Sequence, residues 1–206
     1  MSPDLQTSKV RTPSLTTLVQ QSAWQDAIVA AARAQLKQLP ENCAAAKFKP
    51  TGELIVYAPA EFEPDGTLSG GVWNERVDVT GCNAPIRLNI LTVLQPGGAP
   101  SRIPTMPGDT RADPATQKNA LGYAQAVAIR YMTAMQPGCR QQVFTNTQFD
   151  GYTGLPIAEI QNGRPNRAWR ENWMLFACGQ TYSITITFTP NAKGLQLSAT
   201  NPTKRG

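Results

Sequence analysis

The chain has 206 residues, a net charge of +5 and no histidine. Its length allows one or two domains, and its 41% hydrophobic content is ordinary for a globular protein. The absence of histidine excludes a Ser-His-Asp triad and the usual zinc ligand sets. No apolar run reaches the ~18 residues that span a bilayer, and no glycine-rich phosphate loop is present. We therefore expect no cofactor, no metal and no transmembrane segment.

The two halves of the chain differ in charge. Residues 1–98 contain eight Lys or Arg and nine Asp or Glu, a net charge of −1. Residues 99–206 contain eleven and five, a net charge of +6. This asymmetry suggests that the halves face different partners, and the basic charge of the whole chain fits an anionic partner or envelope surface.

The first predicted element is a helix over residues 15–39, followed by Pro40, which ends it. Its apolar residues recur at roughly helical spacing and define one buried face: Leu18, Ala27, Ile28, Ala31, Ala32 and Leu36.

Strands are expected after this helix. Residues 54–57 are rich in β-formers, and Asp65-Gly66 is typical of a turn between antiparallel strands. Residues 73–80 alternate, so that one face carries Trp73, Glu75, Val77 and Val79. A further strand places Ile86, Leu88 and Ile90 inside. This pattern predicts a sheet with one wet face and one face packed on the helix.

The second half follows the same order. Asp113-Pro114 predicts a helix start, and the helix stops near Pro137-Gly138. Its apolar face is expected to contain Ala120, Ala124, Val127, Ala128, Tyr131 and Met135. Asn162-Gly163 is a second turn signal, and a last strand alternates with Tyr182, Ile184, Ile186 and Phe188 facing inward.

One constant spacing relates the two halves. Cys43 and Cys139 are 96 residues apart, as are Cys82 and Cys178, and the same shift superimposes residues 73–75 on 169–171. We therefore predict an α+β fold made by tandem duplication of a unit, one long helix followed by about four antiparallel strands, with the units related by a pseudo-twofold axis. The expected boundaries are 14–98 and 114–200 for the units, 99–113 for a linker, and 1–13 and 201–206 for flexible tails.

The four cysteines favour two disulfides, because their number is even and no CxxC pair occurs. Pairing within each unit is our first choice, since an ancestral single unit would have joined its own cysteines. Pairing across units, Cys43 to Cys139 or Cys82 to Cys178, stays open because the ends of a simple meander lie at opposite sheet edges. Disulfides predict an extracytoplasmic protein, periplasmic or secreted, whose export signal is absent from this sequence, with Met1 added in its place.

Two groups of residues are candidate binding sites. Glu75 and Glu171 fall in phase with apolar strand positions beside Trp73 and Trp169, where a carboxylate needs partners. If the two approached each other across a cleft, they could divide acid and base roles. The second group mixes cations with aromatic residues, which suits an anionic or aromatic ligand: Arg164, Arg167, Trp169, Arg170 and Trp173.

These features favour an exported, disulfide-stabilised, non-enzymatic binding protein that acts through the surface or groove between its two units. Its partner is expected to be another protein or an anionic envelope component, and no nucleic acid is expected. The alternatives are a small enzyme or small-ligand binder that uses a Glu75/Glu171 cleft, and a structural component of the cell envelope. In organisation, a tandem duplication of helix-plus-sheet units with disulfides, the chain is similar to the β-lactamase inhibitory proteins, although the repeat length differs and no binding motif matches.

Overall fold

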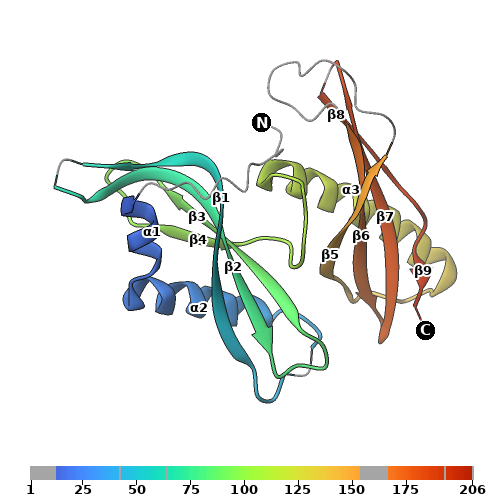
Figure 1. The fold of residues 1–206 in the computed structure, drawn as a ribbon. Coiled ribbons are helices and arrows are strands. Elements are labelled where there is room, and N and C mark those ends of the chain that lie inside the picture. The colour runs from blue at the N-terminus through green and yellow to red at the C-terminus, as the bar shows by residue number, and fades with distance from the viewer. Residues whose placement is uncertain (1–12, 42, 64, 154–166, 193, 206) are drawn as a thin grey trace. The chain divides into compact units, whose positions relative to one another are not determined.

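A computed structural model describes residues 13–41, 43–63, 65–153, 167–192 and 194–205. The fold is α+β with two antiparallel sheets, which confirms the predicted class (Figure 1). Two compact units divide between Pro107 and Gly108. We call them the N-terminal unit, which ends at Pro107, and the C-terminal unit, which begins at Gly108.

In the N-terminal unit, the described residues form two helices and a four-stranded sheet in the order β1-β2-β3-β4. The helices are α1 (Pro13–Val19) and α2 (Ser22–Leu36), and α2 packs against all four strands. The strands are β1 (Lys47–Phe62), β2 (Leu68–Thr80), β3 (Ile86–Leu94) and β4 (Ser101–Pro104). The predicted alternation of the tryptophan strand holds, because Trp73, Val77 and Val79 are fully buried.

The prediction of a single helix over residues 15–39 is wrong, since the helix is interrupted at residues 20–21. Gln21 adopts an extended conformation ahead of α2. The buried positions explain the break: Leu15 and Val19 are four residues apart, and so are Trp24 and Ile28, but five residues separate Val19 from Trp24. In one continuous helix, that step would turn the two apolar stripes to different faces.

The described part of the C-terminal unit contains one helix and five strands. Asp113 caps α3 (Pro114–Met135) by accepting a hydrogen bond from the Thr116 backbone N–H. The sheet runs β5 (Gln142–Thr153), β6 (Ala168–Ala177), β7 (Gln180–Asn191) and β8 (Gly194–Ala199), and β9 (Thr203–Lys204) also pairs with β7. Small side chains let α3 approach β7 and β8 closely, and its fully buried residues are Ala120, Ala124, Ala128 and Met132. Met135, expected inside, is 63% exposed.

Two segments expected to be irregular contain strands. Residues 99–113 include β4, which pairs with β3, for instance Leu91 with Ile103. Residues 201–206 include β9, where Thr203 pairs with Ser183 and Lys204 with Tyr182. In both places short segments satisfy backbone groups at a sheet edge, a tertiary effect that composition does not reveal. The expected tail over 1–13 and the turn at 162–163 lie outside the described residues, except for Pro13, which begins α1.

Each disulfide lies within one unit, Cys43–Cys82 and Cys139–Cys178. The tryptophan strand is the direct neighbour of β1, so Lys47 pairs with Thr80 and the two cysteines of the N-terminal unit lie at the same end of adjacent strands. Gln142 pairs with Ala177 in the same way. The cysteines of each unit therefore do not lie at opposite sheet edges, and the predicted pairing within each unit is confirmed.

Replacing Gly108 with alanine should lower the free energy of unfolding by about 2–3 kcal/mol. Gly108 has φ +93°, and an added Cβ would overlap the Thr147 carbonyl oxygen and the Asn146 side chain. Gly138 is a matched control, because it also has φ +93° but open space around its Cβ position. Gly138→Ala should cost only the backbone strain, about 1 kcal/mol. Urea unfolding of both variants measures the difference, and equal losses would contradict the close approach at Gly108.

Candidate functional site

In the N-terminal unit, Glu75 is the centre of a buried polar cluster. The Trp24 indole N–H lies 3.0 and 3.1 Å from the two carboxylate oxygens, and the Trp73 indole donates to Oε1 at 3.1 Å. The Thr92 hydroxyl donates to Oε1 at 3.2 Å. One carboxylate thus joins α2, β2 and β3. Because Glu75 is only 7% exposed, these donors take the place of water around it.

A cation completes this cluster from β4. The Arg102 guanidinium lies 4.5 Å above the centre of the Trp24 ring. Burial raises the pKa of Glu75 above its ordinary value, and the hydrogen bonds from Trp24, Trp73 and Thr92 and the charge of Arg102 act in the opposite direction. Desolvation is the largest of these effects, so the carboxylate is held at a cost in stability.

Glu75 should make the N-terminal unit less stable as the pH rises from 4.5, the ordinary pKa of the residue, through its raised folded value. In that range the folded unit binds the proton more tightly than the unfolded chain, so the stabilisation present at lower pH is lost on ionisation. Glu75→Gln lacks this titration. The urea midpoint of Glu75→Gln relative to that of the wild type should therefore rise with pH and then level off. A difference that does not change with pH would contradict the raised pKa.

In the C-terminal unit, Glu171 occupies the same kind of site with a different set of donors. The indoles of Trp169 and Trp173 each donate to it at 3.0 Å, one to each oxygen. The Thr110 hydroxyl donates at 3.0 Å and the Arg111 backbone N–H at 2.8 Å, both to Oε1. Glu171 is completely buried. Through these hydrogen bonds, its carboxylate links Thr110 and Arg111, which precede α3, to strand β6.

The hydrogen-bond donors to Glu75 and Glu171 show which contacts of the site could be predicted from the sequence. The repeated Trp-x-Glu places Trp73 and Trp169 beside their glutamates, since residues i and i+2 share one face of a strand. The second indole comes from α2 at Trp24 in one unit and from β6 at Trp173 in the other. The only sequence signal for Trp24 is that each half has one tryptophan outside the shared motif. Thr92, Arg102 and Thr110 gave none.

A second cluster lies at the surface of the C-terminal unit, and we call it the cationic aromatic patch: Arg111, Phe149, Tyr152 and Arg167. The Arg111 guanidinium is 5.0 Å from the centre of the Phe149 ring, and the Arg167 guanidinium is 5.1 Å from that of Tyr152. The two rings meet edge to face at 5.2 Å. Arg111 and Tyr152 are exposed, and Phe149 and Arg167 are half-buried.

A β-bulge builds this patch. Phe149 pairs with Glu171 and Tyr152 with Trp169, although three residues separate the first members and two separate the second. Glu171 and Trp169 point to one face of β6, so their partners do as well. The extra residue falls at Asp150–Gly151, where Gly151 has φ +123° and Asp150 forms an ion pair with Arg170 at 3.2 Å.

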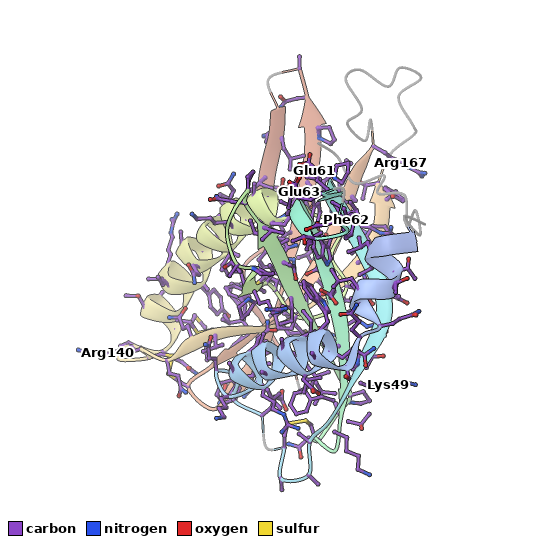
Figure 2. All side chains as sticks on the ribbon, turned by 90° about the vertical axis from the view of Figure 1, so that its left-hand side faces the viewer. Lys49, Glu61, Phe62, Glu63, Arg140 and Arg167 are labelled. Carbon is purple, nitrogen blue, oxygen red and sulfur yellow. A yellow bond between two sulfur atoms is a disulfide. The ribbon has the colours of Figure 1, made fainter. Side chains whose placement is uncertain are left out.

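The structure separates the predicted site residues into three groups. Five are buried inside their units and cannot touch a macromolecular partner while the unit stays folded: Trp73, Glu75, Trp169, Glu171 and Trp173. Arg167 and Arg170 reach the surface, and Figure 2 labels Arg167. Arg164 lies outside the described residues. Sequence reasoning missed Phe149 and Tyr152 because only the bulge places them on one face, and it missed Arg111 because that residue comes from the segment before α3.

Within the described ranges, no three Cys, Asp or Glu residues lie close enough to hold a metal ion. None of the helices described is long and apolar enough to cross a membrane. The two disulfides indicate an oxidising environment.

Comparison with protein-family models, curated proteins and solved structures finds no match to this chain. The similarity in organisation to the β-lactamase inhibitory proteins therefore gains no support. Function has to be argued from the clusters themselves.

Proposed function

We propose that the protein is an exported, non-enzymatic binding protein whose cationic aromatic patch contacts another protein or an anionic envelope component. The observation that carries this proposal is the pair of guanidinium groups held over two adjoining rings, Arg111 over Phe149 and Arg167 over Tyr152. Arginine and aromatic side chains are the groups most often found at the energetic centres of protein interfaces.

Charge favours the same surface. Residues 99–206 carry a net charge of +6, against −1 for residues 1–98. A positive patch accelerates encounter with an anionic partner and selects against cationic ones. The patch is anchored to the buried cluster, because Glu171 accepts from the Arg111 backbone N–H, and Phe149 and Tyr152 pair with Glu171 and Trp169 on the neighbouring strand. A rigid, preorganised surface loses little entropy on binding.

Catalysis through the two glutamates receives no support from their surroundings. Each carboxylate is buried and already accepts hydrogen bonds from its own unit, Glu75 from Trp24 and Glu171 from Trp173 among others. A general acid or base needs a reacting group within hydrogen-bond reach. We therefore assign both glutamates a structural role: Glu75 joins α2 to the sheet, and Glu171 joins the segment before α3 to β6.

We further propose that the two units arose by tandem duplication. Three observations support this. The disulfides have the same sequence separation of 39 residues. The strand registers agree under the 96-residue shift, since Glu75 pairs with Ile90 and Glu171 with Ile186. Each glutamate also accepts from two indoles. The units have diverged at their surfaces, and only the C-terminal unit carries the patch.

Affinity capture from envelope extract tests the binding proposal. Immobilised wild-type protein should recover one partner that Arg167→Glu and Arg111→Glu fail to retain, because each change reverses a charge in the patch. Arg130→Glu is the matched control, since Arg130 is exposed on α3 and outside the patch. Circular dichroism should show that all three variants are folded. The same partner on Arg167→Glu and on the wild type, or no partner enriched over that variant, would contradict the proposal.

A further inference from the structure

Strand β1 is a long outer strand of the N-terminal sheet. It has 16 residues and lies at one end of the strand order of its sheet, where β2 is its only neighbour among the described strands. The opposite outer strand, β4, has only 4 residues. Pro50 and Pro59 both lie within β1, and proline is tolerated in sheets mainly on outer strands. The outer strand of a sheet is the place where another chain can add by backbone pairing.

The side chains of β1 divide between two faces. Five side chains of β1 pack against the core that α2 covers: Phe48, Leu54, Val56, Ala60 and Phe62. Lys47 and Lys49, on either side of Phe48, and Glu61 and Glu63, on either side of Phe62, therefore point to the other face. Between Lys49 and Glu61, bulges interrupt the alternation of β1. Lys47 and Lys49 are at the start of this outer face, and Glu61 and Glu63 are at its end.

These four charged residues are exposed, and no ion pair involves them within the part of the chain that the structure describes. Lys49 projects from one end of β1, and Glu61 and Glu63 lie at the other (Figure 2). Their positions are symmetric about Ile55: Lys49 is six residues before it and Glu61 six after, and Lys47 and Glu63 are eight before and after.

We propose that β1 is a dimerisation strand that pairs antiparallel with β1 of a second copy, with Ile55 at the twofold axis. In that register Lys49 faces Glu61 of the second copy and Lys47 faces Glu63 of the second copy, each pair formed twice. Directly opposed residues of antiparallel strands have Cβ atoms about 4.5–5.5 Å apart, close enough for charges to attract. This inference is independent of the proposed function, because the patch belongs to the other unit.

The same strand limits how far such pairing can extend. A twofold pairing uses β1 of both copies and closes, so no further copy can add at that edge. Pro50 and Pro59 cannot donate a backbone hydrogen bond, and bulges interrupt β1. Only a short run of backbone hydrogen bonds can therefore form between the β1 strands of the two copies. A short ladder contributes limited affinity, so the end charges should have a large share in holding the register.

Charge reversal tests the register. Sedimentation velocity over a concentration series should show a dimer of the full chain. Lys49→Glu alone and Glu61→Lys alone should each weaken dimerisation roughly tenfold, because each creates two like-charge pairs per dimer. An equimolar mixture of the two variants should recover dimerisation, since each variant then presents the charge that its partner lacks.

Lys118→Glu is the matched control, because Lys118 is exposed on α3 of the other unit, and its dimerisation should equal that of the wild type. Circular dichroism checks that every variant is folded. A wild type that stays monomeric at all concentrations overturns the proposal. So does a dimer that neither single variant weakens, or a mixture no better than either variant alone.

Discussion

Replacing Glu171 with alanine should lower the free energy of unfolding of the C-terminal unit by about 4 kcal/mol or more. The substitution removes the acceptor of the Thr110 hydroxyl, the Arg111 backbone N–H and the indoles of Trp169 and Trp173. Each buried donor left without an acceptor costs about 1–3 kcal/mol. Water that enters the vacated space recovers part of this, so the loss should fall below the simple sum.

Glutamine substitutions at the two glutamates make a sharper comparison. Glu171→Gln keeps one oxygen for three donors, but its NH₂ group then faces the Trp173 indole N–H, and two donors oppose each other. We expect a loss of about 1–3 kcal/mol. In Glu75→Gln the second oxygen serves only Trp24, which also donates to the first. That variant should lose less than about 1 kcal/mol, since it also removes a buried charge.

Hydrogen exchange followed by mass spectrometry separates the effects on the two units. Loss of protection in Glu171→Ala and Glu171→Gln should be concentrated in α3 and β5–β9, and Glu75→Gln should leave those segments unchanged. Urea unfolding gives the magnitudes. Should Glu171→Gln prove as stable as Glu75→Gln relative to the wild type, the four-donor arrangement around Glu171 would be wrong.

The fold was predictable wherever a local pattern decides structure. Alternation identified β2 and β7, because every second residue of a half-buried strand faces the core, as Trp73 and Ile184 do. The short strands β4 and β9 were missed, since only pairing with β3 and β7 makes them strands. The break before α2 was missed as well. It follows from the five-residue step between Val19 and Trp24, which matters only once both stripes must face one sheet.

The site was half predictable. The alternation of apolar residues predicted that Glu75 and Glu171 face the core and need hydrogen-bond partners, and both side chains are buried. It could not show whether the partners would be a substrate, an arginine or an indole, because Trp24 and Thr110 approach from other elements. The cationic aromatic patch could not be predicted from the sequence. Phe149 and Tyr152 share a face only because of a bulge, whereas regular alternation would place them on opposite faces.

Removing one disulfide should destabilise one unit and leave the other intact. Cys139→Ser/Cys178→Ser opens a bridge whose cysteines are 39 residues apart, and the chain-entropy model gives a loss of about 3–4 kcal/mol. Cys43→Ser/Cys82→Ser opens the bridge of the same separation in the other unit and is the matched comparison. Hydrogen exchange should show lower protection only in the unit whose bridge is absent. A loss spread over both units would contradict independent bridges.

The size of this effect bears on the compartment. Small domains are stable by about 5–15 kcal/mol, so about 3–4 kcal/mol is a large share of the stability of either unit. A protein made in a reducing compartment would lose both bridges, and its open form should be degraded more quickly. Expression of the same chain in an oxidising and a reducing compartment, with soluble yield and thiol titration as the measurements, should favour the oxidising one strongly. Equal yields of folded protein with four free thiols would argue against an extracytoplasmic role.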